Sequence, residues 1–256
     1  MHLGNGAITP ECALLTMGAA GMGLGAAAVT LRQQLPSRQK LALAAGLGAL
    51  VFAAQAINVP VLPGTSAHLV GGVLLAWTLG PSLGAWTMAI ILAVQALVLG
   101  DGGLAALGAN VLNMALLPAG AVAIGRRMQA AESRWSYATA AFLAAASVPL
   151  AALLIVGETA LFRSGAELGG WQEFAARMVG THLWIGLAEG GLTLAMLAAF
   201  AWLTKTTSSP VASWKPAVAA TCAAIVLALA TPFSSALPDG YEASVQAAGL
   251  HQLLDE

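Results

Sequence analysis

Charged side chains are scarce in this chain of 256 residues. Only 8% of its residues are Asp, Glu, Lys or Arg, whereas 59% are hydrophobic. Soluble domains carry roughly 25% charged residues, because charge has to cover the surface that faces water. The mean hydropathy of +0.82 agrees with this shortage. The composition therefore excludes an ordinary water-soluble domain and indicates that lipid surrounds much of the chain.

Other absences narrow the function. The net charge of −1 leaves no excess of basic residues for nucleic acid. The two cysteines, Cys12 and Cys222, lie far apart without C-x-x-C spacing, which is typical of small buried hydrophobic residues. No P-loop motif occurs, so we expect any ATP hydrolysis to belong to another chain. The sequence around Ser66 lacks the nucleophile motif G-x-S-x-G. We therefore expect a protein that is not an enzyme.

The apolar runs predict an all-α polytopic membrane protein, a compact bundle of about seven to eight transmembrane helices. A crossing needs about 20 apolar residues. The run 68–79 is too short to cross alone, and Gly80-Pro81-Ser82 would turn it directly into the next run. The expected spans are 12–31, 41–59, 68–79, 83–99, 104–124, 137–156, 179–203 and 217–231.

The basic residues predict how the bundle is oriented. If the spans alternate, eight of the ten basic residues lie on one side, which the positive-inside rule makes cytoplasmic. Both ends of the chain then face outward from the bacterial inner (cell) membrane. The start Met1-His2 has no basic region or cleavage site, so we expect no removable signal peptide. The eight residues are Arg32, Arg38, Lys40, Arg126, Arg127, Arg134, Lys205 and Lys215.

Three histidines collect at the outer side of this arrangement: His2, His68 and His182. A histidine at position two is notable because the α-amine, the next amide nitrogen and the imidazole can wrap one metal ion in fused chelate rings. Nitrogen donors in one plane suit Cu(II) or Ni(II). A fourth nitrogen has to come from elsewhere, and His68 is a donor that the topology permits. Such binding would release protons and weaken in acid.

Four sequence blocks together resemble the CbiM/NikM family, the substrate-binding membrane subunits of cobalt or nickel energy-coupling-factor transporters. The similarity runs from Met1 to about residue 203 and includes Thr181-His182 with Glu189. The blocks are Met1-His2-Leu-Gly-Asn-Gly6, Gly64-Thr-Ser-Ala-His68-Leu-Val-Gly71-Gly72, Leu79-Gly-Pro81, and Gly100-Asp101-Gly102-Gly103-Leu104 followed by Gly108-x-Asn110-x-x-Asn113-Met114.

The resemblance implies a ligand set and partners. In that family the metal is held by the amine of Met1, the amide and imidazole nitrogens of His2, and the loop histidine that His68 matches. The N-terminal stretch is tucked into the bundle from outside. The resemblance further implies transported Ni(II) or Co(II), a transmembrane coupling subunit and ATPase subunits. One departure is visible, because Gly4-Asn5-Gly6 replaces the commoner proline and acidic residue.

The C-terminal part resembles a second component. Pro238-Asp239-Gly240-Tyr241-Glu242 is similar to the P-D-G-L-E signature of the small CbiN/NikN accessory subunit. Only the span before this motif is present, so the resemblance implies a shortened accessory segment. We therefore expect two parts: a metal-binding membrane domain over 1–203, then a cytoplasmic linker, one further span and an outer tail over 204–256.

Several polar residues are candidates for supporting the metal ligands, each with a plainer alternative. Asp101 either makes a turn or positions the metal loop. Asn110 and Asn113 share one helix face and either join helices or bond the inserted N-terminal backbone. Glu189 is the acidic residue well inside a span, a functional candidate by default; we expect it to pair with His182 or to cap the N-terminal segment. The full supporting set is Asn5, Ser66, Asp101, Asn110, Asn113, His182 and Glu189.

Two other functions compete with metal import by an energy-coupling-factor subunit. An ion-coupled secondary transporter would show internal repeats and paired broken helices, and no repeat is visible in this sequence. A membrane metal sensor or scaffold would favour a fused signalling domain. Planar nitrogen donors with a deprotonated amide favour Ni(II), yet cobalt-named members share the same ligands, so the choice between the two metals stays open.

Overall fold

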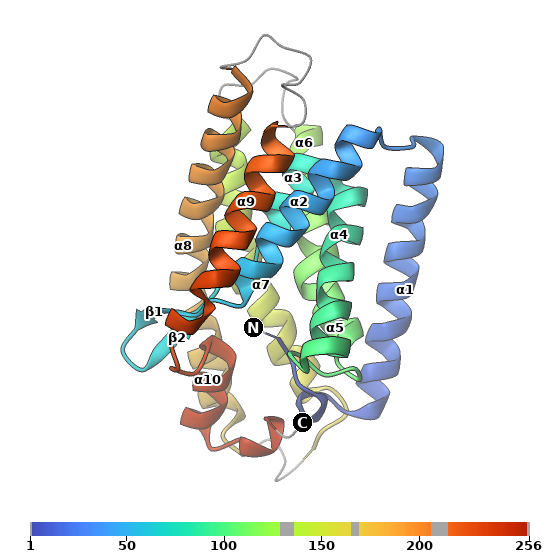
Figure 1. Cartoon of the computed structure of the whole chain (residues 1–256). Coiled ribbons are helices and arrows are strands. Elements are labelled where there is room, and N and C mark those ends of the chain that lie inside the picture. The colour runs from blue at the N-terminus through green and yellow to red at the C-terminus, as the bar shows by residue number, and fades with distance from the viewer. Residues whose placement is uncertain (1, 129–135, 165–168, 206–214, 255–256) are drawn as a thin grey trace.

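The computed structural model describes residues 2–128, 136–164, 169–205 and 215–254. The chain forms an all-α bundle with one small hairpin of two strands (Figure 1). The helices are α1 (Pro10–Gln33), α2 (Arg38–Gln55), α3 (Gly72–Leu79), α4 (Pro81–Val94), α5 (Leu107–Val111), α6 (Leu117–Met128), α7 (Ser136–Ala160), α8 (Trp171–Lys205), α9 (Lys215–Ala230) and α10 (Gly240–Ala248).

Two of these helices continue through π-helical turns. The π-helix η2 (Gln95–Leu99) extends α4, and η3 (Leu112–Leu116) joins α5 to α6. Single π-helical turns inside α-helices occur frequently at functional sites, because the wider turn changes where side chains point. Asp101, which contacts His2, follows η2 closely, and Asn110, which bonds to Leu3, lies just before η3.

Six of the described helical segments are long and apolar enough to cross a membrane, which agrees with a polytopic bundle. Neither α2 nor the eight-residue α3 is among them. As expected, α3 turns directly into α4, because Gly80 has φ +88° and Pro81 then begins α4. The six segments are Pro10–Gln33, Pro81–Leu99, Leu107–Met128, Ser136–Ala160, Trp171–Trp202 and Lys215–Phe233.

The expectation that a helix begins at His68 is wrong. Residues 68–71 are irregular, and α3 begins only at Gly72. Gly71 has φ +77°, and a Cβ there would meet the Val51 side chain at 2.7 Å. Because a left-handed backbone disfavours other residues, this glycine sets the turn from the loop into α3.

The strands form a hairpin between α2 and α3. Strand β1 (Val59–Leu62) pairs antiparallel with β2 (Thr65–Ala67), and Gly64 in the turn has φ +72°. The hairpin lies beside α8 and α10 at the lower end of Figure 1, opposite the connection between α1 and α2. It places the irregular segment 68–71, called here the metal loop, at that end of the bundle.

Two clusters of buried apolar residues hold this arrangement together. The larger one lies among α2, α3, α4 and their neighbours. The smaller one joins parts that are far apart in sequence: Leu3 from the N-terminal segment, Ile155 from α7, Phe174 from α8 and Tyr241 from α10. The two ends of the chain therefore share one apolar cluster next to the metal loop.

Candidate metal site

The imidazole rings of His2 and His68 stack on each other near the hairpin. Their centroids are 5.2 Å apart and their planes are 11° from parallel. The fold thus brings together two of the three residues that were expected to hold a metal. Met1, the third, lies outside the described residues.

The spacing of the two rings fits a shared metal ion. With metal–nitrogen bonds of about 2.0–2.1 Å, two imidazoles on one ion have centroids roughly 4.5 Å apart at adjacent corners of a square and roughly 6.4 Å apart at opposite corners. The observed 5.2 Å lies between these values. The spacing therefore permits both rings to bind one ion, provided that the stacked rings turn so that one nitrogen of each faces it.

The two nitrogens of His2 have different surroundings. Nδ1 lies 3.0 Å from Oδ1 of Asp101. Nε2 is buried and has no hydrogen-bond partner among the described residues. Burial raises the pKa of Asp101, but the hydrogen bond with His2 is among the interactions that together outweigh burial, so the pKa lies below its usual value. Asp101 therefore contacts the His2 ring as well as standing in the turn.

The backbone next to His2 is fixed by Asn110 of α5. The Leu3 amide donates to Asn110 Oδ1 at 2.9 Å, and Asn110 Nδ2 donates back to the Leu3 carbonyl at 3.2 Å. The same carbonyl accepts from the Gly103 amide at 2.8 Å. Irregular backbone at membrane depth needs such partners, because lipid offers none. Asn110 and Gly103 therefore hold the segment that carries His2.

The glycines of the Gly-Asp-Gly-Gly block allow this close approach. Gly102 has φ +92°, and a Cβ on Gly103 would overlap the backbone of Gly4 and Asn5. Asn5 Oδ1 also accepts from the Ala105 amide at 3.0 Å. The block therefore serves as a surface on which the N-terminal backbone lies, which only glycine permits.

His68 is held by its own loop. Its Nδ1 lies 3.0 Å from the carbonyl oxygen of Leu69. Burial lowers the pKa of His68 to about 3, so the ring is neutral at ordinary pH. A neutral imidazole is the form that binds metal ions.

Glu189 of α8 reaches the metal loop from the bundle interior. Its Oε2 accepts from the Val70 amide at 2.9 Å and its Oε1 from the Gly71 amide at 2.7 Å. The side chain is 3% exposed. These described hydrogen bonds go to the loop, not to His182. Glu189 therefore supports the segment that carries His68.

His182 lies at the edge of the site. Its Nδ1 contacts the Met178 carbonyl at 2.7 Å, one helical turn back, and its Nε2 has no hydrogen-bond partner among the described residues. Gly240 packs against it, since a Cβ there would lie 2.8 Å from His182 Cε1. A cavity of about 10 Å³ separates His182 from His68 and Asp239, which is about the space of one water molecule.

Ser66 connects the metal loop to the C-terminal tail, defined here as residues 234–254. Its amide donates to the Pro238 carbonyl at 2.8 Å, and its hydroxyl donates to the Leu237 carbonyl at 2.7 Å. Ser66 and Asp239 form a parallel bridge. Asp239 also begins α10, accepting from the Tyr241 and Glu242 amides. The tail is therefore bound to the strand that leads into His68.

Some residues fall outside the cluster or were missed. Asn113 donates to Glu158 at 2.7 Å and makes no described bond to the N-terminal backbone. Sequence reasoning missed the buried glutamines Gln55 and Gln95. Gln95 donates to Gln55, and Gln55 donates to the Val70 carbonyl. Their only signal is an amide within an otherwise apolar run.

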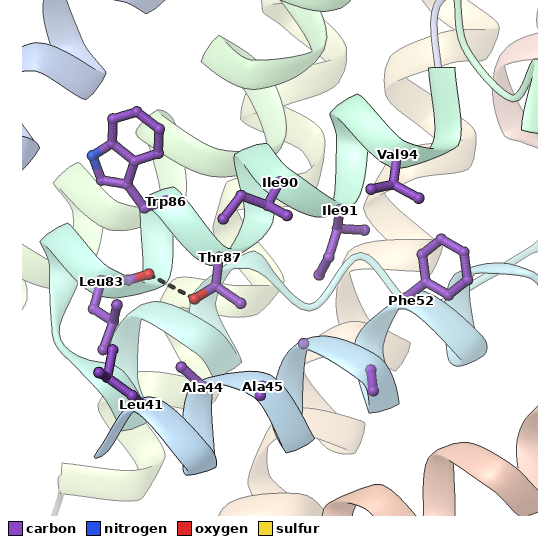
Figure 2. Close-up of a pocket in the computed structure, with 12 residues that line it drawn as sticks. Leu41, Ala44, Ala45, Phe52, Leu83, Trp86, Thr87, Ile90, Ile91 and Val94 are labelled. Carbon is purple, nitrogen blue, oxygen red and sulfur yellow. Dashed lines mark hydrogen bonds between the residues drawn. The ribbon is translucent and has the colours of Figure 1, made fainter. Parts of the chain in front are cut away.

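An apolar groove elsewhere on the bundle offers no metal ligands. Figure 2 shows it between α2 and α4, with Phe52, Trp86 and Ile90 among the side chains around it. Its volume is about 420 Å³. The hydroxyl of Thr87 in this groove donates within its own helix to the Leu83 carbonyl at 2.8 Å.

Among the described residues, no group of three or more His, Cys, Asp or Glu side chains is placed to hold a metal ion. Two imidazoles alone are a weak ligand set for Ni(II) or Co(II). A complete site therefore needs backbone nitrogens, which are what a histidine at position two can add.

The fold and this cluster define a class, the helical membrane proteins with a pair of stacked histidines at one end. The particular family follows from sequence comparison. Residues 2–207 match the model of the CbiM family, described as the cobalt uptake substrate-specific transmembrane region. The chain belongs to this family of metal-transport proteins.

Individual relatives agree with the family. The chain is 40% identical over 161 residues to a putative fused nickel transport protein, NikMN, of Archaeoglobus fulgidus, covering 60% of this chain and 52% of the relative. It therefore spans about half the length of that relative. It is 36% identical over 197 residues to a putative metal transport protein of Haloquadratum walsbyi, covering 75% of this chain and 86% of the relative.

A crystal structure of a transition metal transporter has the same fold. It aligns with a TM-score of 0.69 and 29% sequence identity, covering 80% of this chain and 94% of that structure. The similarity to relatives named for both nickel and cobalt leaves the metal undecided.

Proposed function

We propose that this chain captures Ni(II) or Co(II) with high affinity from the outer side of the membrane, as the substrate-binding subunit of an energy-coupling-factor transporter. The observation that carries the proposal is the stack of His2 on His68, with centroids 5.2 Å apart. Membership of the CbiM family supports the same function.

In the proposed complex, four nitrogens surround the ion in a plane: the Met1 amine, the His2 amide, the His2 imidazole and the His68 imidazole. Only Nδ1 of His2 can close a chelate ring with the His2 amide nitrogen, because Nε2 lies too far along the ring. Asp101 contacts this Nδ1, so metal capture requires the His2 ring to turn away from Asp101. Asp101 thus holds His2 ready and releases it to the ion.

The proposed orientation puts the metal loop outside and the basic end of the bundle inside. Arg32 near the end of α1, Arg38 at the start of α2, Arg126 near the end of α6 and Lys215 at the start of α9 belong to the end opposite the hairpin. By the positive-inside rule this end faces the cytoplasm, in the bacterial inner membrane. The ion then enters beside the tail and leaves toward the basic end.

Inward release needs energy that this chain does not supply. We assign it to a separate transmembrane coupling subunit and ATPase subunits. In this division, residues 1–203 form the metal-binding domain, and residues 204–256 form a linker, one further span and the tail. The fused NikMN relative from Archaeoglobus fulgidus supports an accessory-like role for the tail.

The proposal is tested by calorimetric titration of Ni(II), Co(II) and Zn(II) into the purified full chain with its native N-terminus. We expect one site with submicromolar affinity for Ni(II) or Co(II) and weaker binding of Zn(II), which does not favour a planar ligand set. Uptake of nickel or cobalt by cells should then require co-expression of the coupling and ATPase subunits. Binding of neither metal would refute the proposed function.

A further inference from the structure

A chain of hydrogen bonds ties the metal loop to three helices. Gln95 of η2 donates from Nε2 to Gln55 Oε1 at 2.9 Å, and Gln55 at the end of α2 donates from Nε2 to the Val70 carbonyl at 2.8 Å. From the other side, Glu189 of α8 accepts from the Val70 and Gly71 amides. Gln55, Gln95 and Glu189 are each 3% exposed or less.

These hydrogen bonds hold two consecutive peptide groups of the metal loop. The Val70 carbonyl and the Gly71 amide belong to one peptide group, which lies between Gln55 and Glu189. The Val70 amide belongs to the preceding peptide group, whose carbonyl is that of Leu69. That carbonyl lies 3.0 Å from His68 Nδ1. The chain of contacts therefore ends at His68, the proposed metal ligand.

The last contact fixes which ring nitrogen of His68 carries the proton. A carbonyl oxygen can only accept a hydrogen bond, so His68 Nδ1 must donate to Leu69. The neutral ring then carries its lone pair on Nε2, the nitrogen that can bind a metal ion. A partner that orients a metal-binding histidine in this way typically changes affinity 10–100-fold when it is removed.

Gln95 supports the orientation of the Gln55 amide. The Val70 carbonyl can only accept, so the Gln55 NH₂ group faces it, and Gln55 Oε1 then accepts from Gln95. If the Gln55 amide were reversed, its Oε1 would face the Val70 carbonyl oxygen, and neither oxygen could donate a hydrogen bond. The bond to Gln55 is the one described for the Gln95 side chain, whose Oε1 is buried without a partner in the described part of the chain. Gln95 therefore acts on the loop through Gln55.

We infer that Gln55 and Gln95 are positioning residues for metal capture, which with Glu189 hold the metal loop so that His68 presents Nε2 to the ion. The inference rests on the proposed function and names two residues that it does not otherwise need. Neither glutamine touches the ion. Their effect passes through the Val70–Gly71 peptide group.

The first test is the protonation of His68 in the unchanged, metal-free chain. Nitrogen NMR of the full chain labelled with ¹⁵N-histidine, reconstituted in lipid nanodiscs, distinguishes a ring protonated on Nδ1 from one protonated on Nε2. The His68 signal is assigned by its loss in His68→Gln. We expect the Nδ1-protonated form. An Nε2-protonated His68 would overturn the inference without any variant at the glutamines.

The second test compares Ni(II) affinity and the Ni(II) absorption spectrum in Gln55→Met, Gln95→Met and the double variant. Methionine keeps the length of the side chain and removes the hydrogen bonds. We expect each single variant to lose about tenfold in affinity and the double variant to bind no worse than Gln55→Met, because groups acting in series are not additive. Gln55→Met should also lower the Nδ1-protonated fraction of His68.

Thr193→Val is the matched control. Thr193 is fully buried on α8, one turn beyond Glu189, and its hydroxyl has no hydrogen-bond partner among the described residues. The Thr193→Val variant should bind Ni(II) with the same affinity as the unchanged chain. Glutamine variants that bind like this control, or losses that simply add, would overturn the inference. If the unchanged chain binds neither metal, the proposed function fails. If it binds metal but the glutamine variants bind like Thr193→Val, only this inference fails.

Discussion

The N-terminal segment and the C-terminal tail both reach the metal loop, but they are held in different ways. The backbone of the N-terminal segment is bonded by side chains of the bundle: Asn110 holds Leu3, and Arg163 donates to the Gly6 carbonyl at 2.9 Å. The tail instead bonds to the loop's own strand through Ser66. Both segments pack into one apolar cluster, but side chains of the bundle bond the backbone of the first, whereas the second bonds to the strand before the loop.

The extent of the family match follows the same division. The match covers residues 2–207 and so includes the N-terminal segment and the metal loop, but not the tail. The difference teaches that the segment carrying the proposed ligand His2 has its backbone fixed by bundle side chains, whereas the tail is held by its bonds to Ser66 and by apolar packing. Changes at the N-terminal segment should therefore cost far more metal affinity than changes at the tail.

The largest effect should come from one residue added before Met1. The added residue converts the Met1 amine into an amide and moves His2 to position three, although every side chain is kept. We expect Ni(II) and Co(II) binding to be lost in titration calorimetry. One residue added after Glu256 at the C-terminus should leave metal binding unchanged. Equal affinity and an identical absorption spectrum in the extended chain would show that the amine is not a ligand.

His68→Ala should also abolish high-affinity binding. The substitution removes the fourth nitrogen of the proposed set, while the loop keeps its bonds to Glu189 through Val70 and Gly71. The variant should therefore still insert and purify. His251→Ala, which removes a histidine at the far end of the tail in η7 (His251–Leu253), is the control and should bind normally. Submicromolar binding by His68→Ala would contradict the assignment.

Asn110→Leu tests how the N-terminal segment is held. Leucine fills a similar volume and leaves the Leu3 amide without its bond to Asn110. Each unsatisfied buried group costs about 1–3 kcal/mol, so we expect a loss of about 100-fold in Ni(II) affinity. Asn113→Leu is the matched control, because Asn113 bonds to Glu158 instead. Equal losses in both variants would indicate a general effect on the helix.

Glu189→Gln should weaken the support of the metal loop without changing the ligands. The amide keeps one acceptor oxygen but turns an NH₂ group toward a loop amide, so one of the two bonds is lost. We expect affinity to fall 10–100-fold with the absorption spectrum of bound Ni(II) unchanged. A changed spectrum would mean that Glu189 is itself a ligand.

The sequence predicted the parts of the site that depend on local pattern. A histidine at position two and the Gly-Asp-Gly-Gly block are visible as letters, and both lie where the N-terminal backbone meets the bundle. The partner of Glu189 could not be predicted in this way. Helical spacing shows that His182 and Glu189 share a face, but it does not show which loop packs against that face.

Gln55 and Gln95 could not be predicted for a related reason. A single amide in an apolar run is compatible with helix-to-helix contact anywhere along the bundle. Its role depends on Val70 lying beside it, which only the tertiary fold brings about. The start of α3 could not be predicted because the run 68–79 has no polar side chains except His68 and Thr78, and composition does not reveal the left-handed turn at Gly71.

The smallest effect on metal affinity should come from Ser66→Ala, which loosens the tail. The substitution removes the hydroxyl bond to the Leu237 carbonyl but keeps the backbone bond to Pro238. Losing about 1 kcal/mol of tail binding should speed hydrogen exchange of the α10 amides about fivefold, with Ni(II) affinity changed less than about threefold.

Ser244→Ala is the control for that experiment, because its hydroxyl bonds within α10 to the Gly240 carbonyl at 2.6 Å and does not touch the loop. It should leave the contact between tail and loop intact, so any faster exchange should be confined to α10 itself and should not extend to the Ser66 amide. If Ser66→Ala instead weakened Ni(II) binding as much as Glu189→Gln, the tail would have to be part of the binding unit. The contrast between a segment that delivers a ligand and a segment that covers it would then be wrong.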